Sequence, residues 1–164
     1  MQTNRKIRSR TVGRALVLVV ATAISLAARV GPWGTGDAQG DAYAANNVLQ
    51  GDAYAIDGDT LRVGAAHVRL QGVAAPERGQ HGGPQATEYM KRLVNGKAVR
   101  CVLDGTRSHD RLVGVCYLNE QDVGASVISA GLARDCPRFS KGRYASAETA
   151  ASRMLFFPNY CRPR

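Results

Sequence analysis

Asp59, Arg69 and Glu77 lie close together in the sequence and are of types that could act on a phosphodiester. A guanidinium binds anionic oxygens in pairs, while carboxylates hold a hard metal ion or take a proton from water. Each acidic residue also has an ordinary structural interpretation. Asp59 would then be a turn residue that accepts a backbone hydrogen bond, and Glu77 an exposed carboxylate after a proline.

Two turn signals shape this stretch of the chain. Asp57-Gly58 and Gly64-Ala65 interrupt an alternating apolar run in the way that hairpin turns do. The pattern therefore predicts three short strands, over residues 54–56, 60–63 and 66–72. For Asp57 we expect only a turn role.

The third strand decides where the arginine points. Val68 and Leu70 share one face, so Arg69 points out of the other and is expected to be presented to solvent rather than buried. Pro76 stops the strand from running on. If the third strand lies beside the second, the arginine and the two carboxylates converge on one outward-facing spot.

The rest of the chain predicts two more strands and three helices. The strands cover residues 98–103 and 112–118 and form a hairpin whose turn runs from 104 to 110, and the helices cover about 84–94, 123–130 and 144–155. Asp122 is expected to cap the second helix. Apolar residues at helical spacing predict the packing faces of the first and third helices: Ala86, Tyr89, Met90, Leu93 and Val94, then Tyr144, Ala147, Ala151 and Met154 or Leu155.

The charge of the chain is uneven. Its 22 Lys and Arg exceed its 13 Asp and Glu by nine, but six of the basic residues precede Val30, where no acidic residue occurs, so the remainder carries only +3. That balance is compatible with nucleic acid and equally with an ordinary solvated surface.

The first 28 residues resemble an export signal. A basic stretch to Arg14 precedes an uncharged apolar run from Ala15 to Ala28, which is too short to span a bilayer comfortably. We expect a secreted or periplasmic protein, with an uncleaved membrane anchor as the alternative. Residues 29–47 have the composition of a flexible linker, and 48–164 form a single domain that is expected to be monomeric, with no obligate protein partner.

The four cysteines agree with export. Reflection about the midpoint of the predicted hairpin places Cys101 opposite Cys116, where a cross-strand disulfide is possible. Cys136 and Cys161 would then pair around the last helix. Four unpaired thiols are the alternative, and no spacing indicates a metal clip.

Five sequence pieces, in this order, resemble the staphylococcal nuclease (thermonuclease-like) family over about residues 53–133. They are Ile-Asp-Gly-Asp-Thr-Leu from Ile56, Val-Arg-Leu from Val68, Ala-Pro-Glu from Ala75, Asp-Arg-Leu-Val-Gly-Val from Asp110 and Ile-Ser-Ala-Gly-Leu-Ala from Ile128. The order of elements alone permits several small α+β folds. The resemblance implies an α+β, mainly β fold, a five-stranded Greek-key barrel of the oligonucleotide-binding (OB) type with about three helices. On the cysteine pairing given above, a disulfide at Cys161 holds the C-terminal extension.

The resemblance also implies calcium-assisted hydrolysis of DNA or RNA with little base preference. Asp59 and the carbonyl of Ala75 would then hold the metal ion, Glu77 would position or deprotonate water, and Arg69 and Arg111 would bind the phosphate. His109 stands where the family has a tyrosine and would contact the phosphate or donate a proton. Without the resemblance, Arg111 is a solvated cation at a hairpin end and His109 an exposed turn residue.

One residue departs from the family pattern. Ala74 stands where the family usually has a metal-binding aspartate, so calcium affinity is expected to be reduced. An exported nucleic-acid-binding module without turnover is therefore an alternative, and a disulfide-stabilised structural domain is a third possibility.

Overall fold

The computed structural model describes residues 47–163. The expected export signal and all but the last residue of the expected linker lie outside the described residues. Within the described part, no helix is long and apolar enough to cross a membrane.

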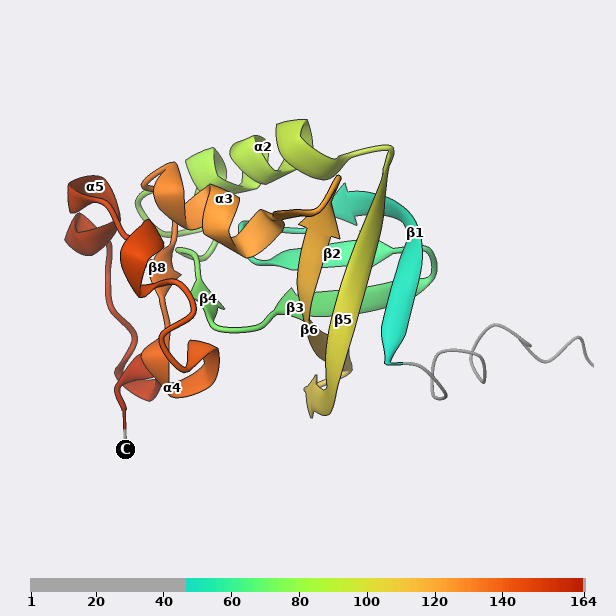
Figure 1. Ribbon diagram of the computed structural model, residues 1–164. Helices are drawn as coiled ribbons and strands as arrows, with labels where there is room; N and C mark the ends of the chain where they lie inside the picture. Colours follow the sequence, from blue (N-terminus) through green and yellow to red (C-terminus); the bar gives the residue numbers. More distant parts are fainter. Residues whose placement is uncertain (1–46, 164) are drawn as a thin grey trace, which may run out of the picture. The chain divides into compact units, whose positions relative to one another are not determined.

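A closed barrel of five strands forms the centre of the domain (Figure 1). Its strands are β1 (Val48–Ala55), β2 (Thr60–Val63), β3 (Ala66–Leu70), β5 (Lys97–Ser108) and β6 (Arg111–Leu118). They follow the order β3-β2-β1-β5-β6, and a parallel pairing of β3 with β6 closes the barrel. This is the predicted OB-type architecture. Three two-residue strands complete the set: β4 (Val73–Ala74), which pairs with β8 (Arg134–Asp135), and β7 (Gln121–Asp122), which pairs with β6.

The barrel core explains why these strands form. Along β3, Val68 and Leu70 are buried while His67 is exposed, as the period of two requires. Strand β1 begins at Val48, earlier than predicted, because it pairs with β5 from that residue onward. Gly51 and Asp52 lie inside it and weaken its pattern, since both residue types are depleted in strands.

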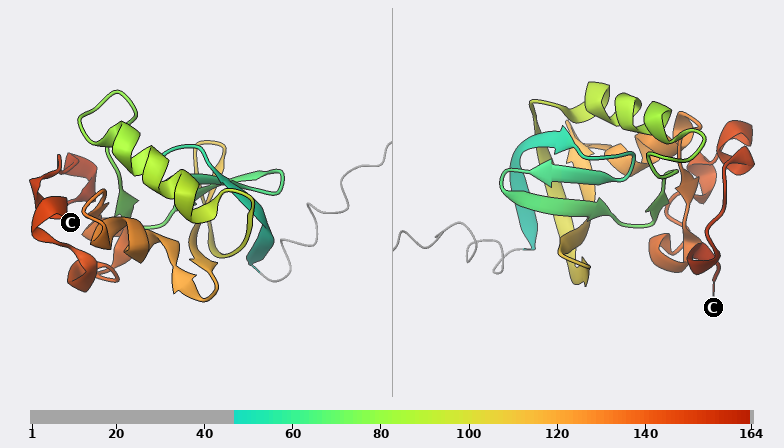
Figure 2. Two further views of the ribbon diagram at one scale, coloured as in Figure 1. Left: turned by 90° about the horizontal axis from the view of Figure 1, so that it is seen from above. Right: turned by 180° about the vertical axis from the view of Figure 1, so that it is seen from behind.

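Two of the predicted helices are present. Helix α2 (Gly83–Val94) lies across the barrel with α3 (Val123–Ser129) beside it (Figures 1 and 2). Asp122 caps α3, since its carboxylate accepts a hydrogen bond of 3.0 Å from the backbone N–H of Ala125.

The third predicted helix, over 144–155, is wrong. That segment contains a 3₁₀ turn, η1 (Ala145–Ala147), and a short α5 (Ala150–Met154). Glu148 between them is extended, and Thr149 restarts the helix through a capping box with Ser152. The predicted packing face is correct only in its first part: Tyr144 is buried and Ala147 packs against the core, whereas Ala151 is exposed and Met154 is 88% exposed. Further short helices, α4 (Pro137–Ser140) and η2 (Asn159–Cys161), occupy segments predicted as loop and tail.

Both predicted disulfides are formed. Cys101 and Cys116 face each other on β5 and β6, and Cys136 is joined to Cys161. The hairpin turn is tighter than predicted, because β5 continues to Ser108 after a register shift between Leu103 and Arg107.

Candidate functional site

The turn between β1 and β2 places Asp59. The carboxylate of Asp57 accepts a hydrogen bond of 2.9 Å from the N–H of Asp59, which is the turn role expected of Asp57. Gly58 packs so closely that an added Cβ would lie 2.6 Å from that of Ala75. The turn therefore rests directly on the segment that leads to Glu77.

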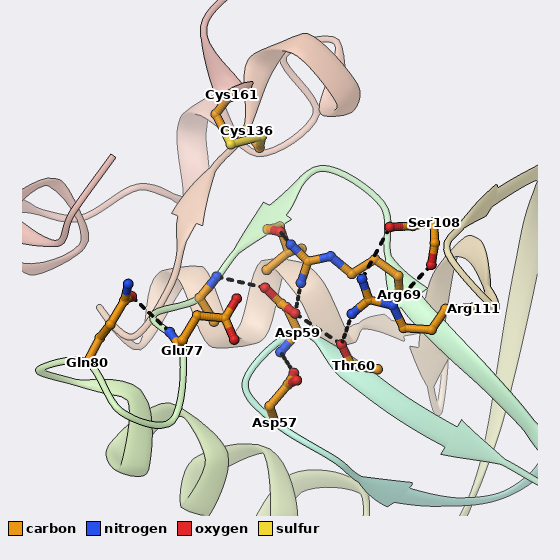
Figure 3. Close-up of polar contacts among 12 residues, drawn as sticks. Asp57, Asp59, Thr60, Arg69, Glu77, Gln80, Ser108, Arg111, Cys136 and Cys161 are labelled. Atoms are coloured by element: carbon orange, nitrogen blue, oxygen red, sulfur yellow. Dashed lines mark hydrogen bonds and ion pairs between the residues drawn. A yellow bond between two sulfur atoms is a disulfide. The ribbon is translucent and has the colours of Figure 1, made fainter. Parts of the chain in front are cut away.

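Asp59 is a buried hydrogen-bonding centre, only 5% exposed. One carboxylate oxygen forms an ion pair with Arg69 and accepts a 3.2 Å hydrogen bond from the Thr60 hydroxyl. The other oxygen accepts a 3.0 Å hydrogen bond from the N–H of Ala75. Asp59 thereby joins strands β2 and β3 to the segment after β4 (Figure 3). It therefore makes more contacts than a residue that only forms a turn.

Arg69 is recessed rather than presented, which corrects the sequence expectation. Its side chain is 17% exposed, because the residues that follow β3 fold back over it. Besides its ion pair with Asp59, it donates a 3.0 Å hydrogen bond to the carbonyl of Val73. Burial lowers the pKa of Arg69, and the Tyr160 phenol opposes this, while the nearby Arg111 lowers the pKa further. The guanidinium is thus held in a partly desolvated position.

Arg111, at the start of β6, is held by three hydrogen bonds rather than solvated freely. It donates to the Thr60 hydroxyl at 3.1 Å and to the carbonyl and hydroxyl oxygens of Ser108 at 3.3 and 3.2 Å. The Thr60 hydroxyl in turn donates to Asp59. A continuous set of hydrogen bonds therefore links the two arginines through a threonine and an aspartate.

Glu77 follows the buried Pro76 and is exposed. Its N–H donates a 3.0 Å hydrogen bond to the side-chain carbonyl of Gln80, which fixes the backbone at that point. Figure 3 shows its carboxylate turned toward Asp59 and Arg69.

One pocket of about 480 Å³ collects most of the predicted site residues. Arg69, Glu77, Arg111 and the exposed His109 line it, whereas Asp59 and Ala75 are not among its lining residues. Asp59 is connected to the pocket through its ion pair with Arg69, and the N–H of Ala75 donates to Asp59. His109 reaches it from the turn of the β5–β6 hairpin, with a backbone φ of 60°. Arg107 and Asp104 line it as well, so three guanidinium groups and two carboxylates face a common space large enough for a nucleotide.

Sequence reasoning missed several residues of this pocket. Ser108 lines the pocket and, together with Thr60, holds Arg111. Thr60 lies inside the first motif, whereas Ser108 lies in none of the five. Phe139 and Tyr160 also line the pocket. Their positions depend on the short helices and the disulfide of the C-terminal segment, so no local pattern indicates them.

The oxygen atoms near Asp59 that could bind a metal ion would hold it only weakly. A carboxylate has about four lone-pair positions, and three at Asp59 already accept hydrogen bonds or the ion pair. Ala74 contributes only a buried methyl group. Among residues 47–163 no group of three or more His, Cys, Asp or Glu is arranged to hold a metal ion. Calcium gathers six to eight oxygens, so such an ion would depend largely on water.

Comparison with known proteins identifies the family. The staphylococcal nuclease homologue family model matches residues 67–153, just over half of the chain, and the chain belongs to this family. A succinoglycan biosynthesis protein, ExoI, of Rhizobium meliloti (strain 1021) is 33% identical over 123 residues, which are 68% of this chain and 64% of that protein. An uncharacterized endonuclease of Escherichia coli O157:H7 is 34% identical over 83 residues, 48% of this chain and 54% of that protein. The chain thus spans between about half and two thirds of these relatives.

Proposed function

We propose that this protein is a nuclease that hydrolyses phosphodiester bonds in DNA or RNA with little base preference. The observation that carries the proposal is the shared pocket, in which Arg69 and Arg111 face the same space as Glu77. The name of the Escherichia coli relative supports the same class of activity.

In the proposed mechanism, the two arginines bind the anionic oxygens of the phosphate. They stabilise the extra negative charge of the five-coordinate transition state, and because the pocket is partly desolvated this contributes more than a surface contact does. Asp59 acts as a positioning residue, since its ion pair and the hydrogen bond through Thr60 orient both guanidinium groups. Arg69 must turn at least one of its N–H groups toward the phosphate.

Glu77 is the proposed general base. It takes a proton from water while the water oxygen forms a bond to phosphorus, and the bond from phosphorus to the leaving oxygen breaks. The leaving oxygen then takes a proton from His109, which lines the same pocket, or from solvent. His109 thus keeps its proposed role as proton donor or phosphate contact.

Calcium is the proposed cofactor, at reduced affinity. Asp59 and the carbonyl of Ala75 would hold it, and when bound it would supply positive charge next to the phosphate.

Export is also proposed. The N-terminal basic and apolar segment supports it, and so do the two disulfides, because such bonds persist in oxidising compartments. The mature protein would then be secreted or periplasmic.

The second candidate function is a nucleic-acid-binding module without turnover, which Ala74 favours. The test is incubation of the full mature protein with single-stranded DNA and with RNA, with calcium or with a chelator. Chelator-sensitive cleavage supports the nuclease, whereas retention without cleavage supports the binding module.

Glu77→Gln gives the sharper test of mechanism. We expect a loss of turnover of about 10²- to 10⁴-fold with strand binding retained, because only the proton transfer is removed. Glu88→Gln is the matched control, since Glu88 is exposed on α2 and outside the pocket. Equal cleavage rates for both variants would remove Glu77 from the mechanism.

A further inference from the structure

The segment after α5 lines part of the pocket, and this segment lies outside the residues that the family model matches. The family match ends at residue 153, whereas Tyr160 in η2 lines the pocket together with Arg69 and Arg111. Tyr160 is 51% exposed. Its ring is therefore available to a molecule that enters the pocket.

The disulfide at Cys161 holds this segment in place. Cys136 is its partner, and the N–H of Cys136 donates a 2.9 Å hydrogen bond to the carbonyl of Gly72. The neighbouring Val73 pairs with β8 and accepts the hydrogen bond of Arg69. One short path of covalent and hydrogen bonds thus connects the C-terminal segment to the phosphate-facing arginine. Figure 3 shows the disulfide at one end of this path and Arg69 at the other.

The close approach at Gly72 makes this connection tight. Gly72 has a φ of 72°, and an added Cβ would lie 2.4 Å from the Cβ of Ser140 in α4. Phe139, in the same helix, is 45% exposed and lines the pocket as well. Two aromatic rings on short helices therefore line the same pocket as the arginines.

We propose that Tyr160 is a substrate-positioning residue that stacks on a heterocyclic base of a single-stranded polynucleotide. This inference rests on the proposed function, because the base belongs to the nucleotide whose phosphate lies on Arg69 and Arg111. Stacking on an aromatic side chain contributes about 1–3 kcal/mol per base and accepts any base, because every base has a π-face. The protein therefore prefers unpaired strands to duplex and discriminates little among bases.

Binding measurements separate this role from catalysis. In a Glu77→Gln background with calcium present, a fluorescent single-stranded oligodeoxynucleotide is compared by anisotropy with an abasic oligomer of the same length and charge. We expect Tyr160→Ala to weaken binding of the oligodeoxynucleotide roughly 5- to 150-fold, which is the stacking contribution expressed as an affinity ratio. Binding of the abasic oligomer stays unchanged, and Tyr160→Phe binds as the parent does.

Two further variants serve as controls for the effect of Tyr160→Ala. Tyr54→Ala is the matched control, since Tyr54 is 41% exposed on β1 and outside the pocket. The double change Cys136→Ser with Cys161→Ser should reproduce the Tyr160→Ala result, because it frees the segment that carries the ring.

The outcomes distinguish the two proposals. If the parent binds neither oligomer, both the proposed function and the stacking role are wrong. If the parent binds and Tyr160→Ala weakens both oligomers equally, or neither, phosphate binding stands and the stacking role is overturned.

Discussion

The barrel and the C-terminal segment place side chains in the same pocket by different physical means. Arg69 and Arg111 stand on β3 and β6, which pair in parallel, so backbone hydrogen bonds set their spacing. Tyr160 stands on a single 3₁₀ turn that a disulfide attaches to Cys136. The charged groups are thus placed by the strand pairing, and the aromatic group by one covalent bond.

Position 74 is where the two regions meet. The methyl group of Ala74 packs with the disulfide of Cys136 and Cys161 in a small apolar cluster, with Phe157 beside it. A carboxylate at this position would be buried against that cluster. The small side chain of Ala74 therefore leaves room for the disulfide that holds the C-terminal segment.

The largest expected effect tests the barrel side of the comparison. Arg111→Ala should lower kcat/KM for strand cleavage about 10²- to 10³-fold, because it removes a positioned cation from the transition state. Arg100→Ala is the matched control, since Arg100 lies on β5, pairs with the exposed Glu120 and does not line the pocket. Steady-state kinetics measure kcat/KM for both variants. Similar values of kcat/KM would mean that Arg111 is only a cation at the end of a hairpin.

The two disulfides should differ in what they stabilise. Replacing Cys101 and Cys116 by serine should lower the free energy of unfolding by about 2–5 kcal/mol, because the bond lies inside the barrel. Replacing Cys136 and Cys161 should change barrel unfolding less. Urea unfolding followed by circular dichroism tests this order. Loop length alone predicts the reverse, since the cysteines are 15 residues apart in the first pair and 25 in the second.

Ala74→Asp tests the meeting point of the two regions. In a chelator, we expect it to lower stability by about 1–3 kcal/mol, because a carboxylate replaces a buried methyl group. Calcium should restore part of the lost stability and should half-saturate cleavage at a concentration lower by about fivefold or more, given roughly 1 kcal/mol for one charge at 4 Å.

Thermal unfolding and calcium titration of activity measure these changes. Ala65→Asp adds the same charge in an exposed turn and serves as the control. An unchanged half-saturation point in Ala74→Asp would contradict the argument that the missing aspartate weakens calcium binding.

The smallest expected effect concerns Asp135 in β8. Burial raises the pKa of its carboxyl group, against a hydrogen bond from Ser140, and one of its oxygens has no hydrogen-bond partner. Because the folded state binds this proton more tightly, the stability of the parent falls as pH rises from the ordinary pKa of an aspartate through the raised value. Asp135→Asn should therefore be more stable than the parent at neutral pH, and this gain should vanish in acid. Thermal unfolding across pH tests this, with the exposed Asp52→Asn as control.

Local pattern was sufficient for much of the domain. The alternation around Val68 and the stripe from Ala86 to Val94 led to the correct strands and helices, because periods of two and 3.6 report which face is buried. The reflection that paired Cys101 with Cys116 succeeded because the inner part of the hairpin is regular. It failed at the turn, where a bulge shifts the register.

Long-range contacts decided what pattern could not. The predicted third helix is interrupted at Glu148, whose carboxylate accepts hydrogen bonds from Arg134 and from the N–H of Asp135. Both partners lie more than ten residues earlier in the chain, so local periodicity does not indicate them. Arg69 is recessed because the chain after β3 returns over it and accepts its hydrogen bond at Val73.

The sequence by itself indicated the class of fold through its resemblance to a family, and it indicated the cysteine pairs through the register of one hairpin. It also supplied Arg69, Glu77 and Arg111 as candidate site residues, because each lies in a short motif. Only the tertiary structure decided that Asp59 holds Arg69 without lining the pocket and that Tyr160 lines it. The physical reason is that both positions depend on contacts between segments distant in sequence, which no local periodicity records.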